Sequence, residues 1–112
     1  MEGEGGRRPA AADERLLAAL WEALRDVFDP ELGYNVVDLG LVYGLEAGEG
    51  RVRVVMTMTT PGCPAGDMIE DGVRQRLLQV PGVEQVEVRV VWSPPWTPEM
   101  MSDDAKRYFG IA

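Results

Sequence analysis

The sequence contains no histidine and only one cysteine among its 112 residues. Without histidine the chain lacks the commonest general base, the usual partner of a nucleophilic cysteine and the commonest metal ligand. A single cysteine forms no intramolecular disulfide, which fits a reducing compartment and predicts a cytoplasmic protein. No apolar run approaches the roughly 18 to 20 residues that span a bilayer, and the first residues lack an export signal, so we expect no membrane partner.

Positive charge is also scarce, with 11 basic against 19 acidic residues and a net charge of −8. Such a chain repels a polyphosphate backbone, so nucleic acid is not expected as a partner, and an acidic soluble surface is the ordinary interpretation. Residues 1–12 show no hydrophobic periodicity and are predicted to form a disordered leader. Residues 13–112 suit a single domain with one core.

Hydrophobic periodicity and turn residues predict six elements. We expect helices over 13–28, 64–80 and 97–110, and strands over 41–46, 51–59 and 83–92. Asp13 and Thr97 are predicted helix caps, Pro30 ends the first helix, a loop covers 29–38, and Gly110 ends the last helix. The order α-β-β-α-β-α predicts a two-layer α+β fold, with a small mixed sheet and helices packed on one face. The other face is expected to be partly exposed, which favours a homodimer.

The most informative segment joins the second predicted strand to the second predicted helix and reads Thr59-Thr60-Pro61-Gly62-Cys63-Pro64. Unpaired N–H groups at a helix start favour an anion, so the Cys63 thiolate is stabilised there as a nucleophile or soft-metal ligand. Gly62 lets the backbone approach a ligand closely, and the prolines stiffen the loop. Acidic residues in the first turns of the helix (Asp67, Glu70 and Asp71) oppose the thiolate.

Two other interpretations of this segment stay open. Cys63 can be a small buried apolar residue, as free cysteines often are. The glycines can also form a phosphate-binding loop, although the segment lacks the Lys-Ser/Thr ending of the nucleotide-binding loop.

Four motifs occur together in this order: Asp29-Pro30-Glu31, Asp38-Leu39-Gly40, the 59–64 segment and Trp92-Ser93-Pro94-Pro95-Trp96. On these motifs the chain, over about residues 13–110, resembles the SufT/PaaD-like family of iron–sulfur, or metal–sulfur, cluster assembly factors. The resemblance implies a small α+β fold and a helper role in cluster assembly or insertion into client enzymes. Some members assist a phenylacetyl-CoA ring oxygenase and are longer, with a further cysteine-rich segment, so the short general type fits this chain better.

The resemblance also implies the site residues. The functional thiol and transient metal ligand is Cys63, supported by Asp38 and Thr59, with Glu31 a weaker candidate. Thr60, Gly62 and Pro64 belong to the same supporting segment. From its position before the first strand, Asp38 can reach the sheet end that bears Cys63, or it can serve as a turn acid. Thr59 at a strand end can equally bond loop backbone.

The Trp-Pro segment has two interpretations. Trp92, Pro95 and Trp96 can form an exposed surface that docks a partner. The same residues, together with Pro94, can instead form a rigid clamp that lays the last helix onto the sheet, which we favour. Met100 and Met101 are expected to be core or interface residues.

The sequence therefore supports an accessory factor in iron–sulfur cluster assembly that is not an enzyme. One cysteine cannot satisfy a cluster that takes four thiolates, so we expect no stably bound cofactor, only a transient cluster. The expected partners are client apoproteins or other iron–sulfur assembly proteins. The alternatives are a protein-interaction adaptor with a structural cysteine, and an enzyme in which a carboxylate such as Asp38 activates a Cys63 nucleophile.

Overall fold

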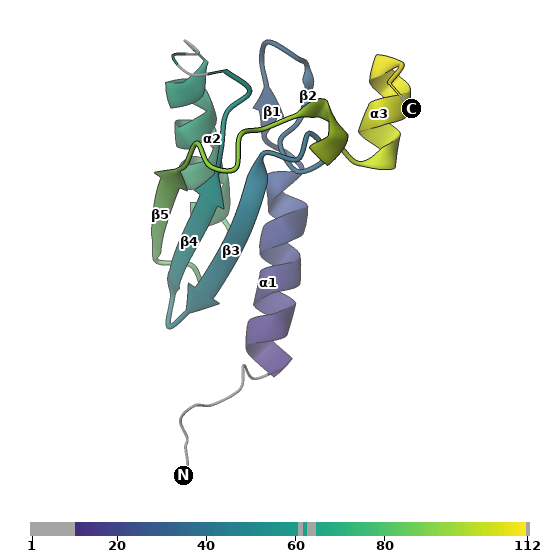
Figure 1. Cartoon of the computed structure of the whole chain (residues 1–112). Coiled ribbons are helices and arrows are strands. Elements are labelled where there is room, and N and C mark those ends of the chain that lie inside the picture. The colour runs from purple at the N-terminus through teal and green to yellow at the C-terminus, as the bar shows by residue number, and fades with distance from the viewer. Residues whose placement is uncertain (1–10, 61, 63–64, 112) are drawn as a thin grey trace.

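The computed structural model describes residues 11–60, 62 and 65–111, and shows an α+β fold (Figure 1). Its elements follow the chain as α1 (Ala11–Leu24), β1 (Phe28–Asp29), β2 (Tyr34–Asn35), β3 (Val42–Gly48), β4 (Arg51–Met56), α2 (Gly66–Leu78), β5 (Gln85–Val90), the 3-10 helix η2 (Pro98–Met100) and α3 (Asp103–Phe109). The predicted fold class and the small mixed sheet are confirmed.

The main sheet has three strands in the order β3-β4-β5. The β3–β4 pair is antiparallel and closes through a tight turn, in which Glu49 and Gly50 have positive φ angles of 54° and 80°. The β4–β5 pair is parallel, with α2 as the crossover between the two strands. Both the predicted hairpin and the predicted parallel crossover are confirmed.

One face of this sheet is covered and the other is open. Val52, Val54 and Met56 on β4 are buried, and they join side chains of α1 and α2 in one hydrophobic core. The alternate β4 side chains, Arg51 and Arg53, are exposed on the opposite face. Because successive strand residues point to opposite faces, this alternation fixes which side of the sheet the helices cover.

The first helix differs from its prediction at both ends. It begins at Ala11, so Asp13 lies inside it and not before it, and the predicted cap is wrong. Alanine has the highest intrinsic helix propensity, which extends the helix toward the N-terminus. At the other end the helix stops at Leu24, and Phe28 lies in β1. The predicted 29–38 loop contains most of a short antiparallel ribbon, in which β1 pairs with β2.

The predicted C-terminal helix is interrupted. Its first turn is η2, with Pro98 in the first turn as expected, and α3 then starts afresh after Ser102. The Ser102 hydroxyl accepts a hydrogen bond from the Ala105 N–H at 3.2 Å, which makes it the helix cap. Gly110 ends α3 in the left-handed conformation, as predicted.

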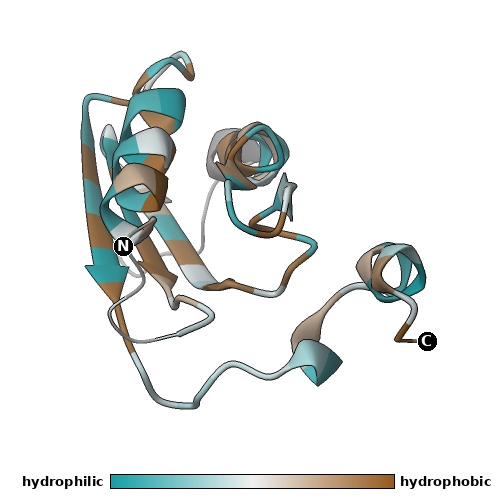
Figure 2. Ribbon diagram, turned by 90° about the horizontal axis from the view of Figure 1, so that it is seen from above, coloured by the Kyte–Doolittle hydropathy of each residue, from teal (hydrophilic) through white to brown (hydrophobic). Residues whose placement is uncertain are grey.

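The last helix does not lie on the sheet. Figure 2 shows α3 apart from the sheet and the other two helices. Its aromatic residues instead pack on the β1–β2 ribbon, where the ring of Tyr34 lies 5.0 Å from that of Tyr108 and 5.7 Å from that of Phe109. None of the helices in the described ranges combines the length and the apolar character needed to cross a membrane.

Candidate functional site

Three segments that carry predicted site residues meet at one end of the main sheet. The Thr57 N–H donates to the Leu41 carbonyl at 2.8 Å, and the Val91 N–H donates to the Met56 carbonyl at 2.8 Å. The loop before β3, the segment after β4 and the segment after β5 therefore leave the sheet side by side, at the upper end in Figure 1. We call residues 26–41 and 57–73 the site end.

The described residues of the 59–64 segment, Thr59, Thr60 and Gly62, lie at the site end, between β4 and α2. Thr59 is half-buried, and Thr60 and Gly62 are exposed. Gly62 has a φ of 75°, a conformation that glycine adopts without strain. Cys63 and Pro64 lie outside the described residues, so the position of the thiol stays a prediction. Helix α2 starts at Gly66, and the residue at its cap position, Ala65, provides no side-chain hydrogen bond.

Asp38 is engaged in contacts with three parts of the chain. Its Oδ2 accepts hydrogen bonds from Arg25 Nη1 at 2.9 Å and from Asn35 Nδ2 at 2.7 Å. Its carbonyl accepts from the Ser102 N–H at 2.8 Å. Burial raises the pKa of this carboxyl, but hydrogen bonds from Asn35 and Ser102 and the Arg25 charge outweigh burial and lower the pKa overall. Asp38 thus ties α1 and the C-terminal segment to the loop before β3.

Asp29 is a site-end carboxylate that the sequence interpretation left out. Its Oδ1 accepts hydrogen bonds from the Glu31 N–H at 2.8 Å and the Leu32 N–H at 3.2 Å, which fixes the turn between β1 and β2. Glu31 itself is exposed in that turn. The Asp-Pro dipeptide is a known turn initiator, so the sequence did contain a signal for this role.

Two buried oxygen atoms at the site end have no hydrogen-bond partner in the described part of the chain. They are Asp29 Oδ2 and the Thr57 hydroxyl, on residues that are 1% and 0% exposed. A buried polar group without a partner costs about 1–3 kcal/mol. Native proteins rarely keep such groups, so these two atoms make the site end a candidate place for a ligand or a reactive group.

The site end is also strongly acidic. It contains no lysine or arginine but seven acidic residues: Asp26, Asp29, Glu31, Asp38, Asp67, Glu70 and Asp71. Arginines from outside reach three of them, Arg25 at Asp38, Arg74 at Asp71 and Arg76 at Asp26. The remaining negative charge favours cations and basic partners, and it opposes the ionisation of a nearby thiol.

The Trp-Pro segment divides between the two predicted roles. The Trp96 indole Nε1–H donates to the Leu39 carbonyl at 2.8 Å, and this ring is half-buried. Trp96 therefore clamps the C-terminal segment against the loop before β3, not against the sheet as predicted. Trp92 is 48% exposed and Pro95 is exposed, so these two remain available to a partner.

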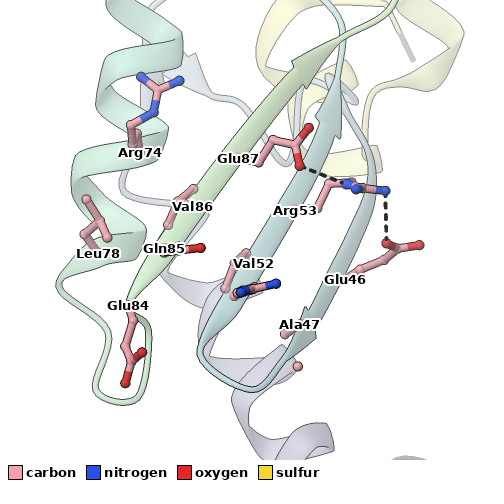
Figure 3. Close-up of a pocket in the computed structure, with 12 residues that line it drawn as sticks. Glu46, Ala47, Val52, Arg53, Arg74, Leu78, Glu84, Gln85, Val86 and Glu87 are labelled. Carbon is pink, nitrogen blue, oxygen red and sulfur yellow. Dashed lines mark hydrogen bonds and ion pairs between the residues drawn. The ribbon is translucent and has the colours of Figure 1, made fainter.

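A hollow lies at the opposite end of the sheet. It has a volume of about 820 Å³ and is lined by residues of β3, β4, β5 and α2 (Figure 3). Arg53 pairs there with Glu87 at 3.2 Å and with Glu46 at 3.9 Å. None of the predicted site residues lines this hollow. Within the described ranges, no group of three or more acidic, histidine or cysteine side chains is placed to hold a metal ion.

Comparisons with known proteins show which family this chain is similar to. A family profile described as "Iron-sulfur cluster assembly protein" matches residues 17–90. The Fe-S protein maturation auxiliary factor YitW of Bacillus subtilis (strain 168) is 44% identical over 100 residues, covering 88% of this chain and 98% of that protein. The Fe-S protein maturation auxiliary factor SufT of Staphylococcus aureus (strain USA300) is 48% identical over 87 residues, covering 77% and 99%.

The fold has a solved counterpart. The crystal structure of a domain of unknown function, DUF59, from Bacillus anthracis superposes with a TM-score of 0.85 at 42% identity, covering 93% of this chain and 100% of that one. This match supports the arrangement of α1, the main sheet and α2 described above.

Proposed function

This chain belongs to the iron–sulfur cluster assembly protein family, and we propose that it is a cytoplasmic accessory factor that helps to deliver a cluster to client apoproteins through the thiol of Cys63. The relatives named as maturation auxiliary factors support this role over an enzymatic one. The single cysteine supports the reducing compartment.

The observation that carries the proposal is the Asp29 carboxylate, which is buried with its Oδ2 unpartnered among the described residues. A structural turn needs only the Oδ1 atom, which already accepts two backbone hydrogen bonds. Oδ2 is thus free to accept a hydrogen bond from a bound group or to meet a cation. Asp29 lies on the site end together with the 59–64 segment, so we assign it to the same site as Cys63.

The cluster is cargo in this proposal, not a resident cofactor. One thiolate supplies one of the four thiolates that a cluster usually takes, so the client, a small thiol or another assembly protein must supply the rest. A cluster held in this way exchanges readily, which suits transfer. The acidic site end works in the same direction, because carboxylates stabilise cationic iron but disfavour a permanently ionised thiol.

The other predicted residues serve the same site. Thr59, Thr60 and Gly62 shape the loop before α2, and Glu31 closes the β1–β2 turn. We assign Asp38 a positioning role, because its carboxylate is held by Arg25 and Asn35 and its carbonyl holds the C-terminal segment.

The test is the substitution Cys63→Ser, with client cluster occupancy measured in cells by the activity and iron content of an iron–sulfur enzyme. We expect occupancy to fall while the circular dichroism spectrum and unfolding midpoint of the purified variant stay unchanged. The alkylation rate of Cys63 against pH, measured in parallel on the unmodified chain, gives the thiol pKa. Unchanged occupancy in a folded Cys63→Ser variant would contradict the thiol role.

The same experiment covers the adaptor alternative, which the exposed Trp92 and Pro95 support. In that case Cys63→Ser retains full occupancy and Trp92→Ala lowers it. If a homodimer supplies two thiols to the cluster, we expect the cluster occupancy of the client to depend on whether the chain is a monomer or a dimer in solution.

A further inference from the structure

A second hollow lies on the site end, between β1 and α2. It has a volume of about 240 Å³, and its walls include Val27, Phe28 and Pro30 on one side and Met68 and Gly72 on the other. The two sides are close at Gly72, where an added Cβ would make an ordinary contact with Val27 Cγ1 at 3.4 Å. This volume is below the roughly 300–1,000 Å³ of small-molecule sites, so it suits one protein side chain better than a cofactor.

The groove is open, and its lining combines apolar side chains with the ion pair of Asp26 and Arg76. Phe28 is 54% exposed and Met68 is 64% exposed, so two large apolar side chains of the same groove face solvent. Exposed apolar side chains that gather around one hollow mark interaction sites. A methionine fits a docking surface for several partners, because its unbranched, polarisable side chain adapts to different shapes.

The charge around the groove defines the partner. Asp26 and Arg76 line the groove and pair with each other at 3.0 Å, so their two charges cancel. Beyond this pair, Asp67 is exposed on α2 next to Met68, whereas Asp71 is exposed but pairs with Arg74 at 3.2 Å. Three arginines (Arg25, Arg74 and Arg76) pair with acidic residues of the site end, against seven acidic residues in all, so the surroundings of the groove remain negative. A partner with basic residues beside its apolar anchor is therefore attracted, and an acidic partner is repelled.

We propose that this groove, lined by Phe28, Pro30, Met68 and Gly72, docks an apolar side chain of a partner protein that is flanked by lysine or arginine. This inference rests on the proposed function in one respect, since it places partner docking beside the loop that carries Cys63. The groove positions a basic, exposed segment of the partner at the site end. The adaptable Met68 lets different partners use the same groove.

The test uses protein labelled with 13C at its methionine methyl groups and a synthetic peptide, Lys-Lys-Leu-Lys-Lys, with blocked ends. Two further peptides carry Ala in place of Leu, or Glu in place of the lysines. We expect the first peptide to shift the Met68 methyl resonance, the Ala peptide to bind about tenfold more weakly, and the Glu peptide to produce no shift. Added salt weakens the binding.

Met100 provides the matched control, because it is also exposed, at 36%, but lies outside the groove. We expect Met68→Gln to weaken peptide binding about tenfold and Met100→Gln to leave it unchanged. Equal shifts at both methyls, equal binding of the Glu peptide, or no Met68 shift at millimolar peptide would each overturn the proposal. A Met68 shift that follows protein concentration without peptide would also overturn it, since a second copy of the chain then fills the groove.

The binding of the peptide to the groove is expected to be independent of the Cys63 thiol. Peptide binding is measured on the Cys63→Ser variant as well, where the groove is expected to bind unchanged. A variant that binds peptide but retains full client occupancy contradicts the proposed function alone. A chain that binds no peptide but loses occupancy on Cys63→Ser contradicts the groove alone.

Discussion

The two ends of the main sheet differ in how their polar groups are satisfied. At the hairpin end, the 820 Å³ hollow is lined by Arg53, which pairs with Glu46 and Glu87 across three strands (Figure 3). At the site end, the smaller 240 Å³ groove adjoins a segment with seven acidic residues and no basic ones. Two buried oxygens there have no partner in the described chain.

The comparison teaches that the size of a hollow is a poor guide to function in this molecule. The ion pairs of the hairpin end are exposed, so each contributes at most about 1 kcal/mol to the free energy of unfolding. Within these pairs, the opposite charges neutralise one another. The site end retains unpaired groups that cost stability, which a fold keeps only when another role requires them. Unbalanced charge and unmet hydrogen bonds are the reasons for which we propose the site end as the functional end.

The largest expected effect concerns the contact that holds the C-terminal segment to the site end. Gly40 has a φ of 80°, and a Cβ there would lie 2.3 Å from the Met100 carbonyl oxygen. We expect Gly40→Ala to lower the free energy of unfolding by about 3 kcal/mol or more, since backbone must move as well as adopt a strained angle. Urea denaturation measures the loss.

Gly33→Ala is the control for that substitution. Gly33 has a similar φ of 71° but nothing within 4 Å of the added Cβ. The backbone conformation alone costs about 1–2 kcal/mol. Equal losses in the two variants would show that the Met100 contact does not hold the C-terminal segment.

A smaller, pH-dependent effect is expected at Asp38. Its folded-state pKa is lowered below the reference value of 3.8, so its stabilising contribution is present at neutral pH and lost as the pH falls through the folded-state pKa. We expect Asp38→Asn to cost about 1–2 kcal/mol at pH 7 and the gap to the unmodified chain to close in acid below about pH 4.

Asp26→Asn serves as the matched variant, because the Asp26 carboxylate is also paired with an arginine but is largely exposed. Its loss is expected to be at most about 0.5 kcal/mol. Denaturation curves recorded at several pH values distinguish the two. A gap for Asp38→Asn that is constant with pH would contradict the ionised, anchoring role.

The elements with a repeating pattern were the predictable part of the fold. The alternation of Val52, Val54 and Met56 predicted β4, and the short glycine-rich turn over 46–50 predicted the hairpin. The β1–β2 ribbon was missed, because two-residue strands carry no periodicity. The last helix was predicted as one continuous helix. The sequence alone does not show whether Ser102 caps a second helix or lies inside the first one.

The site was predictable in outline only. The motifs of the sequence located Asp38, Thr59 and the surrounding loops, which the structure brings to one end of the sheet. Asp29 was missed as a site residue. Its Oδ2 atom lacks a hydrogen-bond partner because the fold buries it, and no local sequence pattern encodes that burial. The groove between Phe28 and Met68 was missed for the same reason, because Phe28 was predicted to face the core from a helix.

Thr57 provides the one stability effect of opposite sign. Its hydroxyl is buried without a partner in the described chain. We expect Thr57→Val to raise the free energy of unfolding by about 1 kcal/mol, because a methyl group of similar shape removes the unmet hydrogen bond. Client cluster occupancy is expected to fall. A less stable Thr57→Val variant would show that the hydroxyl is satisfied in solution.

The most direct test of the central claim, that Asp29 and Cys63 belong to one site, is the pH dependence of Cys63 alkylation in the Asp29→Asn variant. Removing a neighbouring negative charge lowers the pKa of a thiol, so we predict a curve shifted to lower pH than that of the unmodified chain, while Arg53→Gln at the hairpin end leaves the curve in place. Superimposable curves for Asp29→Asn and the unmodified chain, in a variant that remains folded, would contradict the account.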